Sequence, residues 1–245
     1  MRIAITGAGG LVASALQTEL PGAVALRHRE LDVTDADTVR RALAGFDLVL
    51  NCAVVGVDAA EAEPELARRV NVEGAANVAR AVPLAVHFSS NYVLDPVNVY
   101  GRTKLEGERA VLAANPRAVI IRTSWVFGEG GRNFLSTVHQ RLRRAERVEA
   151  IEDVTASVTY ARDLARRVRE LFAAPGVHNI VNEGALTYAD FAEEAARLVG
   201  ADPALVIRVG SDDVMRAPRP RNTPMSATPP LRAWRDALRE YTSVA

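Results

Sequence analysis

Short apolar segments alternate with longer amphipathic segments along most of the chain. The β-branched and aliphatic runs predict strands at Arg2–Thr6, Ala23–Arg27, Asp47–Asn51, Ala85–Ser89, Ala118–Thr123 and His178–Val181. Apolar positions at helical spacing predict helices between them, at Leu11–Leu20, Asp35–Ala44, Pro64–Ala81, Val99–Ala113 and Phe134–Arg144. This alternation of strands and helices predicts an α/β fold with a doubly wound parallel sheet.

The alternation becomes less regular after about residue 150. There the pattern predicts helices at Tyr160–Ala173, Tyr188–Val199 and Leu231–Tyr241, and a short strand at Val206–Val209. We interpret residues 1–150 as the domain that contains the sheet and residues 151–245 as a smaller C-terminal lobe interleaved with the last strand of the sheet. The proline-rich segment Ala217–Pro230 is either a slack linker or an ordered part of that lobe.

The composition is that of an ordinary globular protein. Hydrophobic residues make up 49% of the 245 residues, and the 30 basic and 30 acidic residues cancel. Dedicated nucleic-acid and membrane-surface binders are usually more basic, so we expect neither partner. The arginine-rich run Arg141–Arg147 is read as a solvated helix face. No apolar run is long enough to span a bilayer, and the first residues resemble no targeting segment.

The single cysteine, Cys52, excludes an internal disulfide framework and favours a reducing cytoplasm. Four scattered histidines show no metal-ligand spacing, so no metal site is expected. The sequence leaves the oligomeric state open, with a homodimer as one alternative.

A glycine-rich turn directly follows the first predicted strand. Gly7, Gly9 and Gly10 precede the helix that begins at Leu11, and Gly7 and Gly10 have the G-x-x-G spacing. Glycines there permit a tight turn and let backbone N–H groups approach a pyrophosphate at the positive end of a helix. The arrangement predicts a Rossmann dinucleotide-binding domain. Ala13 stands at the third glycine position, which we interpret as local repacking.

The residue at the end of the second predicted strand bears on the choice of cofactor. Arg27 stands about 20 positions after the first motif glycine, where a carboxylate would accept hydrogen bonds from a ribose hydroxyl. A guanidinium pairs instead with a 2′-phosphate, so Arg27 favours NADP over NAD. The alternative is a solvated arginine partnered by Glu30 or Asp32. Asp32 and Val33 are predicted to border the adenine ring.

Tyr100 and Lys104 lie four residues apart in a predicted helix and therefore share one face. Lys104 is the single lysine among the 30 basic residues. A compact ammonium can reach a ribose while lowering the pKa of a neighbouring phenol, which makes the phenol a better proton donor near neutral pH. We predict that both residues are catalytic and bind the cofactor; the alternative is a plain surface pair.

Ser89, Ser90 and Asn91 end a predicted buried strand. A hydroxyl at the carboxyl end of a parallel strand lies beside the crevice where ligands bind. Ser90 is therefore predicted to hydrogen-bond the substrate carbonyl together with Tyr100. The alternative is that both serines cap the following turn.

Further motifs extend over nearly the whole chain. They are the glycine turn TGAGG, Asn51-Cys-Ala, Val57-Asp-x-x-Glu61, Val70-Asn-Val-Glu-Gly74, Ser89-Ser-Asn-Tyr-Val93, Asn98–Glu108, Arg122–Gly128, Asn133-Phe134, Tyr160–Ala165 and Arg219-Pro220. Together they resemble the extended short-chain dehydrogenase/reductases and, within them, the dTDP-4-dehydrorhamnose reductase family.

The resemblance implies an NADPH-dependent reduction of a nucleotide-linked 4-keto-6-deoxy sugar. Tyr100 would supply the proton, Lys104 would hold the nicotinamide ribose and tune Tyr100, and Ser90 would orient the carbonyl oxygen. The expected cofactor-binding residues are Gly7, Gly9, Gly10, Leu11, Arg27, Asp32, Val33, Cys52, Ala53, Tyr100 and Lys104. The expected substrate-binding residues are Ser90, Asn91, Trp125, Asn133, Arg219 and Asn222.

Three departures from the family pattern bear on the substrate. Ser90-Asn91 stands where the family usually has Thr-Asp, the loop before Tyr100 is reduced to Val93–Val99, and the turn Asp153–Thr159 lacks the usual Gln, Gly and Pro. A smaller keto substrate and a non-catalytic NADP-binding regulatory subunit are therefore the alternatives. An epimerase or dehydratase would need further acid-base groups near Ser90, and Asn91 provides no titratable carboxylate.

Overall fold

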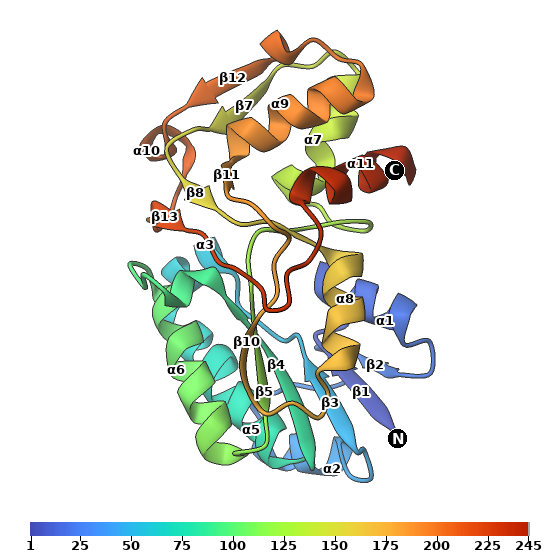
Figure 1. Ribbon diagram of the computed structural model, residues 1–245. Coiled ribbons are helices and arrows are strands. Elements are labelled where there is room, and N and C mark those ends of the chain that lie inside the picture. Colours follow the sequence, from blue (N-terminus) through green and yellow to red (C-terminus); the bar gives the residue numbers. More distant parts are fainter. Residues whose placement is uncertain (245) are drawn as a thin grey trace.

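Six parallel strands form the central sheet of the computed structural model, which describes residues 1–244 (Figure 1). Their order is β10-β5-β4-β3-β1-β2. The strands are β1 (Ile3–Thr6), β2 (Val24–Leu26), β3 (Leu48–Asn51), β4 (Leu84–Ser90), β5 (Val119–Thr123) and β10 (Gly176–Asn179). They confirm the predicted α/β fold and the six predicted strands of its sheet, with ends displaced by a residue or two.

Helices cover both faces of this sheet. They are α1 (Leu11–Glu19), α2 (Ala36–Ala42), α5 (Ala75–Arg80), α6 (Val99–Ala114) and α8 (Ala161–Glu170). Ala4 and Val49 pack in the core with α2, α5 and α6, whereas Ile5 and Leu50 pack in the core with α1 and α8 (Figure 1). Strands buried on both faces carry continuous apolar runs, which is why the sequence shows them so clearly.

The helix predicted at Pro64–Ala81 is interrupted. The structure has a separate short helix α3 (Val57–Ala62), then α4 (Pro64–Arg68), a π-helical turn η1 (Arg69–Gly74) and α5. Inside η1, the Asn71 side chain accepts a hydrogen bond from the Val55 N–H (2.8 Å) and donates to the Thr103 hydroxyl (3.1 Å). The π-turn thus places the Asn71 amide between the loop at Val55 and α6. Single π-helical turns inside helices are frequent at functional sites.

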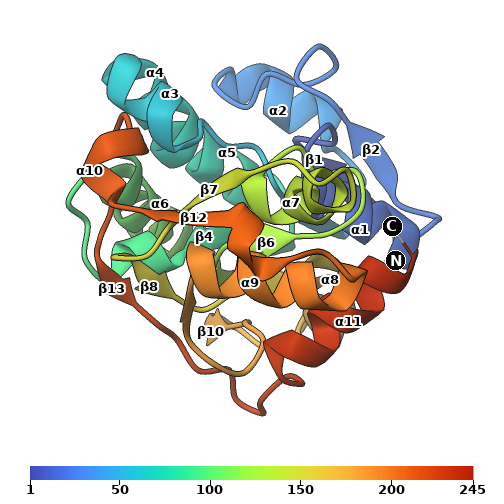
Figure 2. The same ribbon diagram turned by 90° about the horizontal axis from the view of Figure 1, so that it is seen from above.

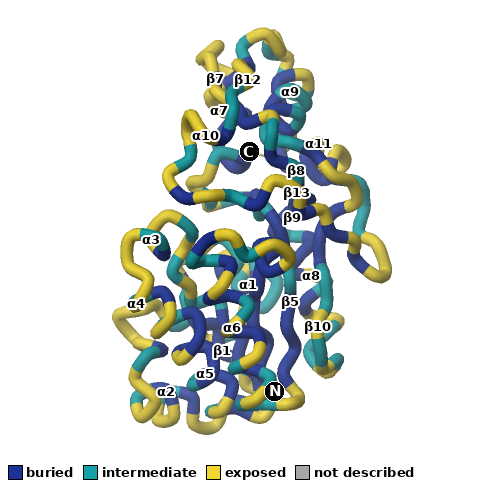
Figure 3. The backbone as a smooth tube through the Cα atoms, turned by 90° about the vertical axis from the view of Figure 1, so that its left-hand side faces the viewer, coloured by how far each residue is buried: buried dark blue, intermediate teal, exposed yellow. Residues whose placement is uncertain are grey.

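A second hydrophobic core forms a lobe beyond the carboxyl ends of the strands, and we call it the upper lobe (Figures 1 and 3). Its helices are α7 (Phe134–Arg143), α9 (Tyr188–Val199), η3 (Pro203–Leu205), α10 (Ser211–Val214) and α11 (Trp234–Val244). Its strands are β6 (Val126–Phe127), β7 (Val148–Ile151), β8 (Thr155–Ala156), β9 (Thr159–Tyr160), β11 (Leu186–Thr187), β12 (Val206–Val209) and β13 (Asn222–Thr223).

The two cores interleave along the sequence. Leu142 of α7 and Val148 of β7 belong to the upper core, although they precede residue 150, while α8 and β10 return to the sheet. Figure 2 shows β12 beside β7 with α9 next to them. The upper lobe therefore sits directly over the end of the sheet where ligands of doubly wound folds bind.

The proline-rich segment Ala217–Pro230 is ordered, so its interpretation as a slack linker is wrong. It contains β13, which pairs with β8, and Thr223, Met225 and Ala227 are buried at alternate positions. Alternate burial is the pattern of an extended strand against a core. Prolines suit this segment because few of its backbone N–H groups are needed in a ladder.

Candidate active site

The glycine turn lies where the strand order reverses, between β1 and β3. Gly7 has φ of +64°, and a Cβ there would lie 2.6 Å from the carbonyl carbon of Cys52. Gly10 is the N-cap of α1 and provides no side-chain cap, so the first N–H groups of the helix face outward without a side-chain acceptor. These are the features of a turn that accepts a pyrophosphate.

A mainly apolar cavity of about 290 Å³ adjoins this turn. It is lined by Gly7, His28, Leu31, Asp32, Val33, Ala53, Val54, Val55, Leu66 and Val70. Asp32 is fixed by accepting hydrogen bonds from the Thr34 N–H (2.9 Å) and hydroxyl (2.8 Å), which lower its pKa. Asp32, Val33 and Ala53 thus line one cavity beside the glycine turn, where the sequence predicts the adenine end of a dinucleotide.

Arg27 is exposed and directly precedes His28, which lines this cavity. Glu30 accepts a hydrogen bond from the backbone N–H of Arg27 (2.7 Å), while Asp32 is occupied by Thr34. Among residues 1–244, no carboxylate forms an ion pair with the Arg27 guanidinium. The side chain thus stays available for an anionic group.

A second cavity, of about 260 Å³, opens at the carboxyl ends of β4 and β5, under the upper lobe. It is lined by Val57, Ser89, Ser90, Asn91, Tyr92, Tyr100, Thr123, Ser124, Trp125, Val126, Tyr188 and Arg219. Five residues predicted from the sequence therefore meet here, from segments as distant as β4 and the proline-rich segment. They are Ser90, Asn91, Tyr100, Trp125 and Arg219.

Burial raises the pKa of Tyr100, while a hydrogen bond with the Ser90 side chain acts in the opposite direction. Lys104 is not among the groups that lower this pKa, contrary to the expectation from the sequence. Lys104 is almost fully buried, and its Nζ donates to the Phe88 carbonyl oxygen (2.6 Å) and lies 3.1 Å from His87 Nε2. Burial lowers the pKa of Lys104 to about 8, and the Glu108 carboxylate opposes that shift.

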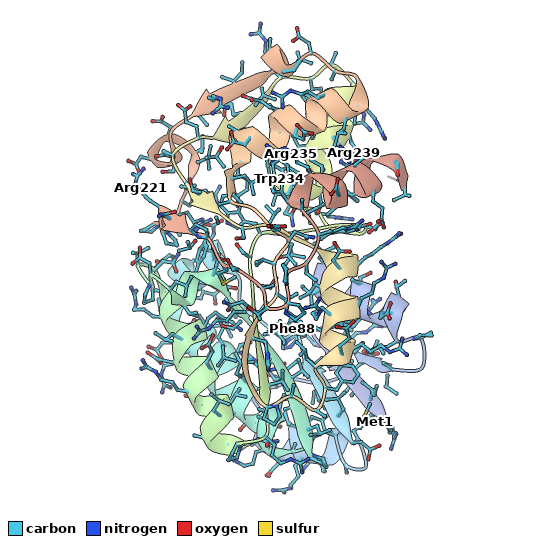
Figure 4. The ribbon with its side chains drawn as sticks, viewed as in Figure 1. Met1, Phe88, Arg221, Trp234, Arg235 and Arg239 are labelled. Atoms are coloured by element: carbon cyan, nitrogen blue, oxygen red, sulfur yellow. The ribbon has the colours of Figure 1, made fainter. Side chains whose placement is uncertain are left out.

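Phe88 lies on β4, near the level where the sheet meets the upper lobe (Figure 4). Its carbonyl oxygen and the His87 ring form the inner end of the space that the Lys104 side chain occupies. The side chain of Lys104 is thus held inside the sheet lobe, one helical turn from Tyr100 on the same face of α6.

Asn91 joins the sheet to the upper lobe. Its amide donates to the Thr223 hydroxyl (2.7 Å), and its oxygen accepts from the Ser90 hydroxyl (3.2 Å). Arg219 pairs with Asp58 (2.9 Å) on the opposite wall. Both contacts hold the proline-rich segment over the cavity.

The structure does not bring Asn133 and Asn222 to this cavity. Asn133 is the N-cap of α7: it accepts from the Ser136 N–H (2.9 Å) and donates to the Val126 carbonyl (2.8 Å). Asn222 is exposed in β13. A capping role explains why an asparagine precedes α7.

Sequence reasoning missed Tyr188 and gave Tyr92 no role. The Tyr188 ring packs on Trp125 with ring centroids 3.9 Å apart, and the Tyr92 ring meets Tyr100 edge to face at 5.6 Å. Trp125 has φ of +31°, a strained conformation for a bulky residue, and its buried indole N–H has no partner among residues 1–244. Such strain and unpaired donors gather at ligand sites, but neither is visible in a sequence.

Comparison with known proteins agrees with this geometry. The family described as RmlD substrate binding domain matches residues 1–244. The dTDP-4-dehydrorhamnose reductase of Mycolicibacterium smegmatis is 38% identical, over 98% of this chain and 84% of the relative. The chain belongs to this family.

Solved structures agree as well. A dTDP-4-dehydrorhamnose reductase ortholog from Clostridium acetobutylicum has a TM-score of 0.92 at 30% identity, covering 100% of this chain and 99% of its own. The Bacillus anthracis dTDP-4-dehydrorhamnose reductase in complex with NADP has a TM-score of 0.91 at 26% identity, with the same coverage. The family fold therefore extends over both lobes.

The loop before α6 is short and partly exposed. After the 3₁₀ turn η2 (Asn91–Val93), only a few residues lead to Val99, and Leu94 and Val97 are exposed. Beside them lies an open cavity of about 530 Å³, which Arg219 also lines.

Within residues 1–244, no helix has the length and apolar character needed to cross a membrane.

Proposed function

We propose that this chain is an NADPH-dependent reductase of a nucleotide-linked 4-keto-6-deoxy sugar. One observation carries the proposal: Ser90 and Tyr100 line a single cavity at the carboxyl ends of the strands, and the bare N-terminus of α1 opens at the same edge of the sheet. The relatives' names supply the substrate class, since they are dTDP-4-dehydrorhamnose reductases.

Each residue of the cavity would have its own role in the reduction. NADPH, when bound, supplies the hydride. Ser90 donates a hydrogen bond to the keto oxygen and orients it, and Tyr100 gives its proton to that oxygen as charge develops. A raised pKa keeps the Tyr100 phenol protonated, as a donor must be, until the substrate arrives.

Lys104 is buried one helical turn from Tyr100, within reach of a nicotinamide ribose seated along β4. We assign it to hold that ribose. Gly7, Gly9, Gly10 and Leu11 would take the pyrophosphate, with Cys52 and Ala53 along its path. Arg27 would take the 2′-phosphate.

The sheet lobe would hold the cofactor, and the upper lobe would hold the sugar nucleotide. Arg219 suits a diphosphate because a guanidinium binds phosphate oxygens in pairs. Trp125 and Tyr188 offer an aromatic surface to the sugar or base. Asn91 would contact the sugar, and Asn133 and Asn222 stay as predictions for the outer part of the site. A cytoplasmic location and a homodimer also stay as predictions.

The test is NADPH oxidation with dTDP-4-dehydrorhamnose by the wild-type protein and by Tyr100→Phe. Loss of a general acid costs about 10²- to 10⁴-fold in turnover. Turnover by the variant should therefore fall by about 10²-fold or more, while its affinity for NADPH stays unchanged. Tyr92→Phe is the matched control, because Tyr92 lines the same cavity but no proton transfer is assigned to it.

Two outcomes would contradict the proposal. A Tyr100→Phe variant with nearly full turnover would remove Tyr100 from its role. Tight NADPH binding by a wild-type protein that reduces no such sugar would exclude this substrate. The open cavity left by the shortened loop would then favour a different ketone or a non-catalytic NADP-binding subunit.

A further inference from the structure

A line of buried polar groups runs from Lys104 across the sheet toward the glycine turn. Lys104 Nζ lies 3.1 Å from His87 Nε2, and His87 Nδ1 lies 3.3 Å from Asn51 Nδ2. Asn51 Oδ1 in turn accepts from the Thr6 hydroxyl (2.6 Å). All four residues are at least nine-tenths buried, so each polar atom must be matched by its neighbour rather than by bulk water.

The direction of the hydrogen bonds is set at the Asn51 end. The backbone N–H of Ala53 also points at Asn51 Oδ1 (3.3 Å), and a backbone N–H can only donate. The amide oxygen must therefore face Ala53 and Thr6, which leaves the amide nitrogen facing His87. An amide nitrogen can only donate, so His87 Nδ1 has to be the acceptor.

A neutral imidazole with an accepting Nδ1 bears its proton on Nε2. Burial keeps His87 neutral, because it holds the pKa of the ring well below its ordinary value. The Nε2–H then points at the Lys104 amine. An uncharged amine can accept that hydrogen bond, whereas an ammonium has no lone pair and would face the N–H with a like charge.

We propose that His87 and Asn51 are positioning residues for Lys104: Asn51 fixes the tautomer of His87, and the resulting Nε2–H favours the uncharged amine of Lys104 in the protein without cofactor. The inference deepens the proposed function, since Lys104 belongs to the proposed active site. It concerns how readily Lys104 loses its proton in the protein without cofactor, and no reaction step depends on it.

The Glu108 carboxylate favours the charged form of Lys104, but its own negative charge is balanced by other partners. Glu108 lies one turn further along α6, and its carboxylate forms two bonds with Arg122 of β5 (2.9 and 2.6 Å). The Ser89 hydroxyl donates to the same carboxylate (2.5 Å). Burial raises the pKa of the Cys52 thiol, so it stays uncharged.

The remaining titratable group on this face of α6 is Tyr100, which burial keeps protonated. Gly107, on the same helix, lets α6 approach η1, since a Cβ there would lie 2.3 Å from the Asn71 carbonyl oxygen. The tautomer of His87 therefore decides whether Lys104 Nζ faces an N–H group or a lone pair at Nε2.

The first experiment reads the tautomer of His87 directly. ¹⁵N-labelled histidine in the wild-type protein without cofactor gives ring-nitrogen shifts that differ between the two tautomers, and the His87 signal is identified by its loss in His87→Gln. A proton on Nε2 is expected. A proton on Nδ1, or a charged ring near neutral pH, would overturn the proposal.

The second experiment uses the fact that Lys104 is the single lysine of the chain. ¹³C-labelled lysine then reports one side chain, and its titration gives the pKa of Lys104 without interference. In His87→Gln the amide can turn its oxygen toward Nζ, so the pKa should rise by about one unit, a tenfold gain in proton affinity. His178→Gln, a matched change on β10, should leave it unmoved.

Asn51→Asp tests the other half of the line. A carboxylate cannot donate to His87 Nδ1, so the ring proton should move to Nδ1 and Nε2 should become an acceptor for Lys104. A Lys104 pKa that stays at its wild-type value in both His87→Gln and Asn51→Asp would refute the proposal. None of these readouts requires turnover, so a protein that reduces no sugar would contradict the proposed function alone.

Discussion

Single residues show which parts of the site a sequence reveals. The G-x-x-G spacing singles out Gly7 in the sequence, and its left-handed backbone and close approach to Cys52 explain why glycine stands there. Helical spacing singles out Tyr100 and Lys104, because it places them on one face. No such spacing singles out His87, because its partners come from β3 and α6 and meet only in the folded chain. A buried histidine in a strand looks the same in a sequence whether it touches a lysine or a leucine.

Arg27 bears on cofactor choice at the same scale. Its guanidinium is exposed and forms no ion pair within the described residues, so a 2′-phosphate would gain a charge-assisted contact without breaking another. Such a bond contributes about 1.5–3 kcal/mol, so Arg27→Ala should weaken NADPH binding by about ten- to a hundredfold. Fluorescence titration with NADPH and NADH measures both affinities.

The NADH affinity of Arg27→Ala should stay close to that of the wild type, since NADH has no 2′-phosphate. Arg29→Ala, a neighbouring exposed arginine, is the control and should change neither affinity. Equal weakening of both cofactors in Arg27→Ala would show that Arg27 supports the loop rather than the phosphate.

Elements of regular length were predictable, and very short ones were not. The strands of the main sheet stand out because both faces are buried. The strands β6, β8, β9, β11 and β13 have two residues each, too few for an alternating pattern. β13 lies in a proline-rich segment, where composition favours a loop, and tertiary contacts with β8 decide the outcome.

The contact between α6 and η1 gives a prediction at the element scale. Gly107 of α6 faces the Asn71 carbonyl oxygen, which a Cβ would approach to 2.3 Å. Gly107→Ala must push the helix away from η1 or distort the π-turn, and overpacking of this kind costs about 1–3 kcal/mol. Urea unfolding of the variant should show that loss.

Gly22→Ala is the matched control, because a Cβ at Gly22 would meet nothing within 4 Å. Its free energy of unfolding should differ little from that of the wild type. A Gly107→Ala variant as stable as Gly22→Ala would mean that α6 has slack against η1, which the structure does not show.

Across the whole molecule, polar contacts of the proline-rich segment help to join the two lobes. Asn98 donates to the Pro218 carbonyl oxygen (2.7 Å), Asn91 donates to Thr223 (2.7 Å), and Arg219 pairs with Asp58 (2.9 Å). Such contacts explain why residues of one site are spread from β4 to the end of the chain. These residues lie far apart in the sequence, so their contacts cannot be predicted from local pattern. Only the resemblance to a family points to them.

Arg219 lines both the cavity with Tyr100 and the larger open cavity, at the junction of the lobes. Arg219→Ala should raise the KM for the sugar nucleotide by about ten- to a hundredfold while NADPH affinity stays unchanged, since a lost phosphate contact is worth about 1.5–3 kcal/mol. Steady-state kinetics measures both. Arg239→Ala, an exposed arginine of α11 that lines neither cavity (Figure 4), is the control. A KM equal to that of the control would place the diphosphate elsewhere.

The stability of the whole chain should depend on pH through His139, in the core of the upper lobe. Both ring nitrogens of His139 are buried without a hydrogen-bond partner among residues 1–244, and burial lowers its pKa below 6.5. The unfolded chain therefore takes up a proton below pH 6.5 that the folded chain excludes. The resulting contribution to stability is present above that pH and is lost as the pH falls.

His139→Phe removes this loss and keeps an aromatic ring against Tyr241, which His139 meets edge to face at 5.0 Å. Removing two unpaired buried polar atoms should stabilise the protein by about 1–3 kcal/mol at neutral pH. The gain should grow by up to about 1.4 kcal/mol for each unit that the pH falls below the ordinary histidine pKa. Urea unfolding at about pH 7 and about pH 5.5 measures it, with the exposed His28→Gln as control. A gain that is the same at both pH values would show that His139 takes up its proton inside the folded lobe, and that the core there admits water.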